Sequence, residues 1–140
     1  MDVSILIVSK NRKQDLEKTL SIIEKCIDKK CHEIRVFLDG CTDGSEVLKN
    51  IFPWIHWEVV KETIGASIAR NILYNKAVGS IFIGFDDDAH PLNTDFIQRV
   101  LKIFIKNPNI GIIAFEEVKG VFDTDERAIK SGTSNSISTV

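Results

Sequence analysis

The sequence predicts an α/β fold in which helices flank a mostly parallel, doubly wound sheet. Short apolar runs alternate with segments of helical periodicity along the chain, and parallel neighbours need crossover connections of this kind. The chain has 140 residues, of which 44% are hydrophobic and 27% charged, the balance of one globular domain with a single core.

The expected strands are short, apolar and rich in β-branched residues. Val3–Ser9 is a nearly continuous run of this kind, which is typical of a strand buried on both faces. Further strands are expected at Glu33–Leu38, Ile55–Val60, Ser80–Phe85 and Ile110–Phe115.

The segments between these runs carry apolar residues at helical spacing. The first helix is expected to extend through Ile27. Gly79 is expected to follow the third helix as its C′ residue, and Thr94 is expected to cap the fourth helix. The second and third helices are expected at Ser45–Phe52 and Ser67–Ala77, and the fourth ends before Asn107 and Pro108.

The periodicity fails after Glu116, so residues 1–116 are expected to form the folded core. Residues 117–140 are expected to be an irregular tail, because Ser131–Thr139 is too polar to bury a face.

Composition excludes several classes of function. The formal net charge is −2 and no basic patch is found, so a nucleic-acid partner is not expected. Three cysteines without a Cys-x-x-Cys spacing indicate reduced thiols rather than disulfides or a zinc site. No signal peptide and no run of about 20 apolar residues is found, which predicts a cytoplasmic protein and leaves attachment to a membrane surface open.

Polar and acidic residues follow the expected strands. Ligands bind outside the carboxyl ends of the strands in open parallel sheets, so these residues are candidates for a site. They are Ser9, Lys10 and Asn11 after the first strand, Asp39 after the second and Asp86, Asp87 and Asp88 after the fourth, with Gly65 and Arg70 from the third crossover.

Three adjacent carboxylates repel one another, and a bound divalent cation removes the conflict. Oxygen ligands without cysteine suit Mg²⁺ or Mn²⁺, which also take phosphate oxygens, so a phosphorylated substrate is expected. The alternative is that Asp87 and Asp88 cap the following turn and stay solvated. His90 is a weaker candidate for a metal or phosphate contact, and Trp54 and Trp57 are expected to pack rather than to stack on a sugar.

Four motifs in order resemble those of the nucleotide-sugar-dependent glycosyltransferases of family 2, which have the GT-A fold. Val3–Arg12 is similar to the opening strand of the family and its Pro-Thr-Tyr-Asn-Arg end, of which Asn11 and Arg12 are kept. Leu38–Ser45 resembles the Asp-Asp-Gly-Ser-Thr-Asp-Gly-Thr loop, Gly65–Asn71 resembles Gly-x-x-x-Ala-Arg-Asn, and Asp86–Asp88 matches Asp-x-Asp.

The resemblance implies that residues 117–140 are the start of an incomplete acceptor segment, and it implies roles for the residues of the four motifs. Asp39 would recognise the base, and the acids of Asp-x-Asp would address the ribose and the metal on the diphosphate. The implied nucleotide-sugar site is Ser9, Asn11, Arg12, Asp39, Gly65, Arg70, Asp86 and Asp87, and the implied metal site for Mn²⁺ or Mg²⁺ is Asp88 with Asp86.

The implied activity is transfer of a sugar, with inversion, from a nucleotide-diphosphate sugar to an acceptor hydroxyl. A UDP-sugar is the favoured donor and a glycan or lipid-linked molecule of cell-surface polysaccharide synthesis is the implied acceptor, while a homodimer stays open. No catalytic residue is assigned, because the spacing of the acids from Glu116 to Glu126 selects no general base. The rival readings are a phosphoryl-transfer domain, which the absence of acids after the first strand disfavours, and a non-catalytic nucleotide- or carbohydrate-binding module.

Overall fold

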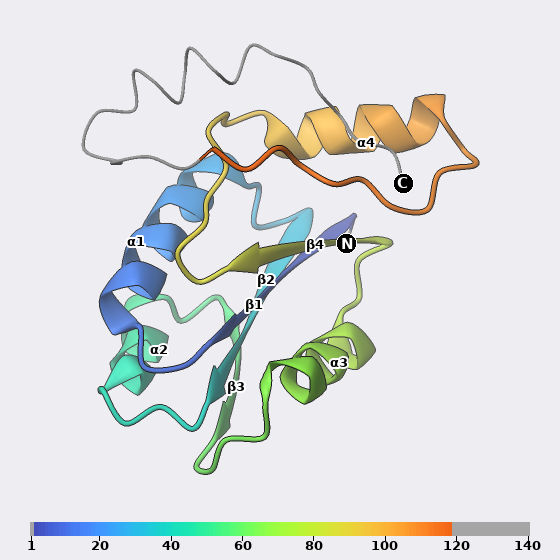
Figure 1. Cartoon of the computed structure of the whole chain (residues 1–140). Coiled ribbons are helices and arrows are strands. Elements are labelled where there is room, and N and C mark those ends of the chain that lie inside the picture. The colour runs from blue at the N-terminus through green and yellow to red at the C-terminus, as the bar shows by residue number, and fades with distance from the viewer. Residues whose placement is uncertain (1, 119–140) are drawn as a thin grey trace. The chain divides into compact units, whose positions relative to one another are not determined.

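The computed structural model describes residues 2–118, and the chain divides into two units, Met1–Pro91 and Leu92–Val140 (Figure 1). The predicted tail at 117–140 lies almost entirely outside the described residues. Among residues 2–118, no helix combines the length and the apolar character needed to cross a bilayer.

The first unit contains a sheet of four parallel strands in the order β3-β2-β1-β4. Ile5 of β1 pairs with Ile34 of β2 on one side and with Ile83 of β4 on the other. The predicted α/β class with a parallel sheet is therefore confirmed. The strands are β1 (Val3–Ser9), β2 (His32–Asp39), β3 (His56–Val60) and β4 (Ile81–Asp86), each within one or two residues of its predicted bounds.

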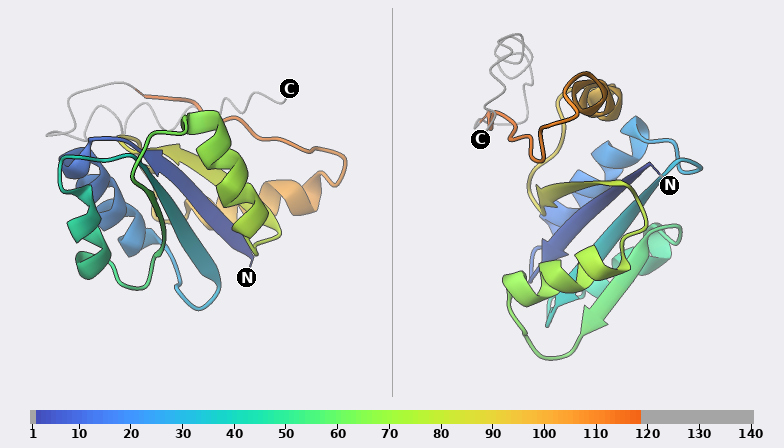
Figure 2. Two further views of the ribbon diagram at one scale, coloured as in Figure 1. Left: turned by 90° about the horizontal axis from the view of Figure 1, so that it is seen from below. Right: turned by 90° about the vertical axis from the view of Figure 1, so that its right-hand side faces the viewer.

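Helices cover both faces of this sheet, as Figure 2 shows. α3 lies on one face, and α1 and α2 lie on the other. The helical segments of this unit are α1 (Lys13–Ile23) with the 3₁₀ turn η1 (Glu24–Cys26), the 3₁₀ turn η2 (Ser45–Val47) with α2 (Leu48–Ile51), and α3 (Ala66–Lys76).

The two periodicities of the sequence explain these two layers. Successive residues of a strand point to opposite faces, so Leu6 and Phe37 form a cluster with Ala69 and Leu73 of α3. Ile5 and Ile7 have the other parity and are fully buried, as are Leu16, Leu20 and Ile23, which α1 presents at helical spacing. Strands that are buried on both faces follow from the nearly continuous apolar runs.

A buried carboxylate network joins the amino ends of the strands, which we call the amino edge. Glu33 is 3% exposed and accepts hydrogen bonds from Ser4 Oγ, from the backbone N–H of Val78 at 2.8 Å and from Arg35 Nε at 3.0 Å. Burial raises the pKa of Glu33, but these bonds outweigh it, and the net pKa is lowered.

Gly79 follows α3, but it is not the left-handed C′ residue that was predicted. α3 ends with Ala77 in an extended conformation, and Gly79 has no left-handed φ. A Cβ on Gly79 would lie 2.5 Å from the backbone nitrogen of Ser4. The residue is small because β1 passes close to it, and its N–H donates to Ser4 Oγ at 2.8 Å.

The second unit contains α4 (Phe96–Lys106) and differs from the prediction in two places. Asp95, not Thr94, is the N-cap residue of α4, and its carboxylate pairs with Arg99 at 2.9 Å. The predicted strand Ile110–Phe115 is not formed, since Ala114 alone in this segment has a bridge partner. An apolar run becomes a strand only where a ladder of backbone partners is available, and Gly111 further weakens this one.

The first helix is also shorter than predicted. The α-helical part ends at Ile23, η1 follows, and Ile27 is extended.

The two tryptophans pack against neighbouring residues. Trp54 Nε1 donates to Glu24 at 3.0 Å, and Lys29 Nζ lies 4.4 Å from the centre of the Trp54 ring. Trp57 Nε1 donates to the Phe52 carbonyl at 3.1 Å. Both tryptophans therefore have structural partners.

Candidate nucleotide-sugar and metal site

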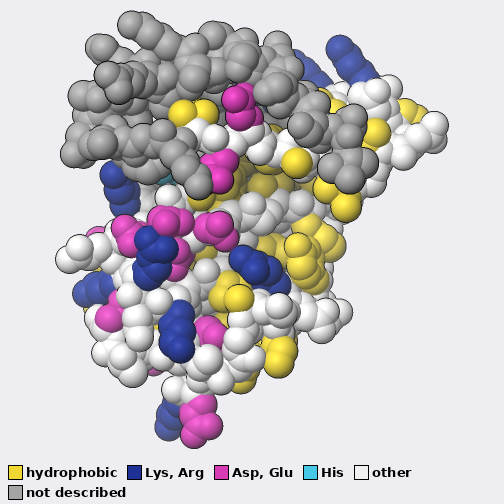
Figure 3. Space-filling model, in the orientation of Figure 1, with side chains coloured by type: hydrophobic (Ala, Val, Ile, Leu, Met, Phe, Trp, Pro, Cys, Tyr) yellow, Lys and Arg dark blue, Asp and Glu magenta, His cyan; other side chains and the backbone are white. Residues whose placement is uncertain are grey.

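The carboxyl ends of β1, β2 and β4 bring the predicted polar residues to one edge of the sheet, which we call the carboxyl edge. The register places Val8 of β1 opposite Asp86 of β4, and Ser9 opposite Leu38, the residue before Asp39. The residues that follow these partners therefore meet. Figure 3 shows acidic side chains gathered next to basic ones on the face that the first unit presents in this view.

Asp87 is the most enclosed carboxylate of the acidic turn Asp86–Asp88. It is 7% exposed, accepts a hydrogen bond from Ser9 Oγ at 2.7 Å, and lies 3.5 Å from Arg12 Nη1. Burial raises the pKa of Asp87; Ser9 and Arg12 oppose this effect, Asp88 adds to it, and the net pKa is raised. The alternative that Asp87 stays solvated is wrong.

Arg12 links this turn to the start of α1. Its Nη2 lies 2.9 Å from Asp88 Oδ2, and its Nε donates to Asp15 Oδ2 at 3.0 Å. The hydrogen bond to Asp15 is the largest of the influences that raise the pKa of Arg12. The role of Asp15 was not predicted, although the spacing of three residues from Arg12 across the helix start is a known signal for such a pair.

Asp86 faces the other arginine of the site. Arg70 Nη2 of α3 lies 3.3 Å from Asp86 Oδ1, and both side chains are more than half exposed. Helix α3 therefore supplies a cation to the carboxyl edge, in line with the position predicted for Arg70. Since the pair is open to water, its contribution to stability is small, and both groups are accessible to a ligand.

Asp39 holds the loop that leads into α3. Its Oδ1 accepts the N–H of Ile64 at 2.7 Å and its Oδ2 accepts the N–H of Gly65 at 3.0 Å, while its carbonyl accepts the Thr63 hydroxyl at 3.0 Å. The carboxylate is 3% exposed. Gly65, with φ 93°, is the N-cap residue of α3, so Asp39 fixes the start of the helix that carries Arg70.

Asn11 and Asp43 connect the loops after β1 and β2. Asn11 has φ 55°, and its Oδ1 accepts the N–H of Thr42 at 2.7 Å. Asp43 accepts the N–H of Lys13 at 2.8 Å and that of Ser45 at 3.1 Å, so it caps α1 from a distant part of the chain. Burial raises the pKa of Asp43, but the hydrogen bonds from Ser45 and Lys13 prevail and lower it.

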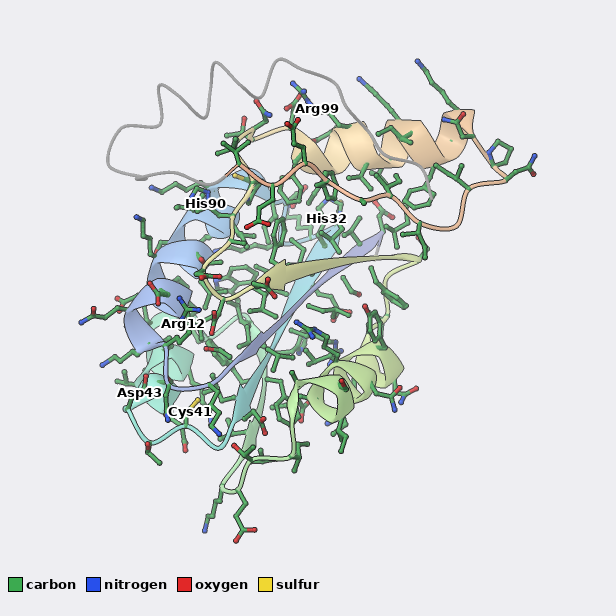
Figure 4. All side chains as sticks on the ribbon, in the orientation of Figure 1. Arg12, His32, Cys41, Asp43, His90 and Arg99 are labelled. Atoms are coloured by element: carbon green, nitrogen blue, oxygen red, sulfur yellow. The ribbon has the colours of Figure 1, made fainter. Side chains whose placement is uncertain are left out.

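This cap was missed, because an Asp-Gly pair in sequence signals only a turn. Figure 4 shows Arg12, Cys41 and Asp43 together in these loops. The thiol of Cys41 lies 3.4 Å from the N–H of Asn11. His90 ring Nδ1 lies 3.2 Å from the carbonyl of Pro91.

The residues present fit a divalent cation that is shared with a phosphorylated ligand. Asp86 and Asp88 offer exposed carboxylate oxygens on one turn, and each lies beside a guanidinium group. Within residues 2–118 no group of three or more potential ligands is preassembled. Mg²⁺ and Mn²⁺ are commonly bound in this way, by one or two carboxylates plus substrate phosphates.

Comparison with solved structures shows the same fold in two glycosyltransferases. TarS of S. aureus, residues 1–349 in complex with UDP-GlcNAc, superposes with a TM-score of 0.72 and 18% identity over 86% of this chain and 35% of the other. A mannosyltransferase of Pyrobaculum calidifontis in complex with GDP-Man and Mn²⁺ has a TM-score of 0.67 and 22% identity over 78% of this chain and 33% of its own. This chain therefore spans about a third of these enzymes.

Sequence comparison extends over more of the chain. An uncharacterised protein of Haemophilus influenzae is 30% identical over 131 residues, which cover 86% of this chain and 68% of that protein. Residues 4–137 match the sequence model of a protein family, which is described as glycosyl transferase family 2. Together with the parallel sheet and the acidic carboxyl edge, this match shows that the chain belongs to glycosyl transferase family 2.

Proposed function

We propose that the carboxyl edge binds a nucleoside-diphosphate sugar together with Mn²⁺ or Mg²⁺, and that the sugar is transferred to an acceptor hydroxyl. The observation that carries the proposal is the acidic turn Asp86–Asp88, which follows β4 directly and faces the guanidinium groups of Arg12 and Arg70. A bound diphosphate is stabilised by a cation, which carboxylates can hold, and by guanidinium groups, which can donate to its phosphate oxygens. The family and the complexes of its structural neighbours with UDP-GlcNAc, UDP and GDP-Man support it.

The residues divide the work by their chemistry. Asp88 and Asp86 would hold the cation, which supplies Lewis-acid stabilisation of the charge that develops on the leaving diphosphate. Arg70 sits beside Asp86, where its charge can meet the same phosphates. Ser9 holds Asp87, the enclosed member of the acidic turn, through its hydroxyl hydrogen bond. Asp39 fixes the start of α3, and the family resemblance implies that it also recognises the base.

The finer parts of the proposal follow from the family resemblance. We propose a UDP-sugar as donor, inversion at the anomeric carbon, and a glycan or lipid-linked acceptor.

Calorimetric titration of UDP into the full chain, with and without MnCl₂, tests the site. Binding is expected to require Mn²⁺ and to be lost in Asp88→Asn. The control is Asp95→Asn, which removes an exposed aspartate that also pairs with an arginine but lies in the second unit. UDP binding that is independent of Mn²⁺ and of Asp88 would refute the metal site.

A transfer assay separates catalysis from binding. Labelled UDP-sugar is incubated with the chain, Mn²⁺ and polysaccharide acceptors, and the anomeric configuration of the product is read by NMR. Metal-dependent UDP binding without transfer or hydrolysis of the donor would favour the non-catalytic binding module.

A further inference from the structure

Arg12 contacts three carboxylates at the same time. Its Nε donates to Asp15 at 3.0 Å, its Nη2 lies 2.9 Å from Asp88, and its Nη1 lies 3.5 Å from Asp87. A cation ligated by Asp88 Oδ2 would therefore compete with this guanidinium for the same oxygen. The Arg12 guanidinium is the one that touches two members of the acidic turn within residues 2–118.

The backbone of Arg12 is held on both sides, while its guanidinium remains accessible. Asn11, with φ 55°, is fixed through its side chain by Thr42, and the N–H of Lys13 is fixed by Asp43. The Arg12 side chain itself is 45% exposed and the Asp88 side chain 47%. Movement of the guanidinium away from Asp88 therefore needs only side-chain rotation.

We propose that Arg12 is an internal counter-cation of the acidic turn, which pairs with Asp88 and leaves it when a divalent cation binds. The inference rests on the proposed function. A cation on Asp88 Oδ2 would lie within a few ångströms of the guanidinium, and like charges at such a distance repel. Asp15 gives the displaced guanidinium a partner, because it already accepts from Nε.

The charges of the turn indicate the direction of the effect. Asp86, Asp87 and Asp88 together face two guanidinium groups, those of Arg12 and Arg70. Removal of the Arg12 charge makes the turn more negative and frees Asp88 Oδ2. The metal-free turn then attracts a cation more strongly, so Arg12 sets the threshold of metal concentration at which the site fills.

Binding of Mn²⁺ alone to the full chain tests this inference, with the EPR signal of free Mn²⁺ as the readout and no nucleotide present. Arg12→Gln is expected to bind Mn²⁺ about fivefold more tightly than the unmodified chain, as for loss of one exposed charge pair. Arg12→Lys keeps the charge and is expected to retain most of the original affinity. The matched control is Arg99→Gln, which removes an exposed arginine paired with Asp95 and is expected to change nothing.

Three results would overturn the inference: Mn²⁺ affinity that is unchanged or weaker in Arg12→Gln with an intact circular dichroism spectrum, equal tightening in Arg12→Lys, or no Mn²⁺ binding by either protein. The UDP titration of the unmodified chain distinguishes this failure from failure of the proposed function. Metal-dependent UDP binding with an unaltered Arg12→Gln affinity rejects the counter-cation alone. Tighter Mn²⁺ binding in Arg12→Gln without any UDP binding rejects the donor site alone.

Discussion

The hydroxyl of Ser9 donates a hydrogen bond to Asp87 at 2.7 Å, across 78 positions of sequence. The donor stands at the end of β1 and the acceptor just after β4, and both side chains are buried. This bond ties the acidic turn to β1, one of the two interior strands of the sheet. It also provides a donor to a carboxylate whose pKa burial has raised.

Ser9→Ala is expected to lower the free energy of unfolding by about 1–2 kcal/mol at pH 7.5, because it leaves a buried carboxylate without its hydroxyl donor. The folded-state pKa of Asp87 is raised, so its ionisation costs stability above that pKa, and protonation at lower pH removes the cost. The loss should therefore be smaller at pH 4. Urea unfolding at both pH values measures it, with Ser67→Ala, an exposed serine of α3, as control. A penalty that is equal at both pH values would contradict this account.

Asp39→Asn tests the loop between β3 and α3. The asparagine keeps one carbonyl oxygen and sets an NH₂ group against an N–H of Ile64 or Gly65, so the free energy of unfolding should fall by about 2 kcal/mol. UDP affinity should fall as well, since Arg70 depends on the start of α3. Urea unfolding and calorimetry measure the two effects. Full stability in this variant would mean that the two amide bonds contribute little.

Glu33→Gln tests the network at the amino edge. Because the folded-state pKa of Glu33 is lowered, its contribution to stability is present above its usual pKa of about 4.3 and is lost as the pH falls through the folded-state value. We expect a loss of about 3 kcal/mol at pH 7 in the variant and a flatter dependence of stability on pH below 4.5. Chemical unfolding between pH 3 and pH 7 gives the comparison. Glu46→Gln, at an exposed glutamate of η2, is the control and should behave like the unmodified chain.

Gly79→Ala tests the close approach of β1 to the turn before β4. The added Cβ meets the Ser4 nitrogen at 2.5 Å, and such overpacking should cost about 1–3 kcal/mol. Gly84→Ala is the matched control, because a Cβ there meets nothing within 4 Å. Thermal and urea unfolding of both variants measure the difference. Equal stability of the two would show that the backbone moves apart without strain.

The sequence was sufficient for the sheet because the apolar runs of β1 and β2 are buried on both faces, and the apolar run of β4 leads directly into the acidic turn. It failed where the outcome depends on distant partners. Ile110–Phe115 has the composition of a strand but forms no ladder of backbone hydrogen bonds. Gly79 is a residue type that often follows a helix, but here it is required by the close approach of β1. The end of α1 was misjudged because Ile27 has the correct spacing yet adopts an extended conformation.

The candidate site was predictable as a set of positions but not as a set of contacts. Parallel strands place Ser9, Asp39 and Asp86 at one edge of the sheet, and this placement does not depend on the contacts of their side chains. The pairs that Arg12 makes with Asp88 and Asp15, and the cap that Asp43 gives to Lys13, depend on loop conformations such as the left-handed φ of Asn11. The functional roles of these residues remain predictions until the titrations above are made.

The separation of the two serines of β1 has a consequence for mutagenesis. Ser4 serves the network around Glu33 at one end of the strand, and Ser9 serves the acidic turn at the other. Because the two hydrogen-bond networks share no partner, the losses of stability caused by Ser4→Ala and Ser9→Ala should add in the double variant. One strand therefore carries two anchor points that can be changed independently of each other.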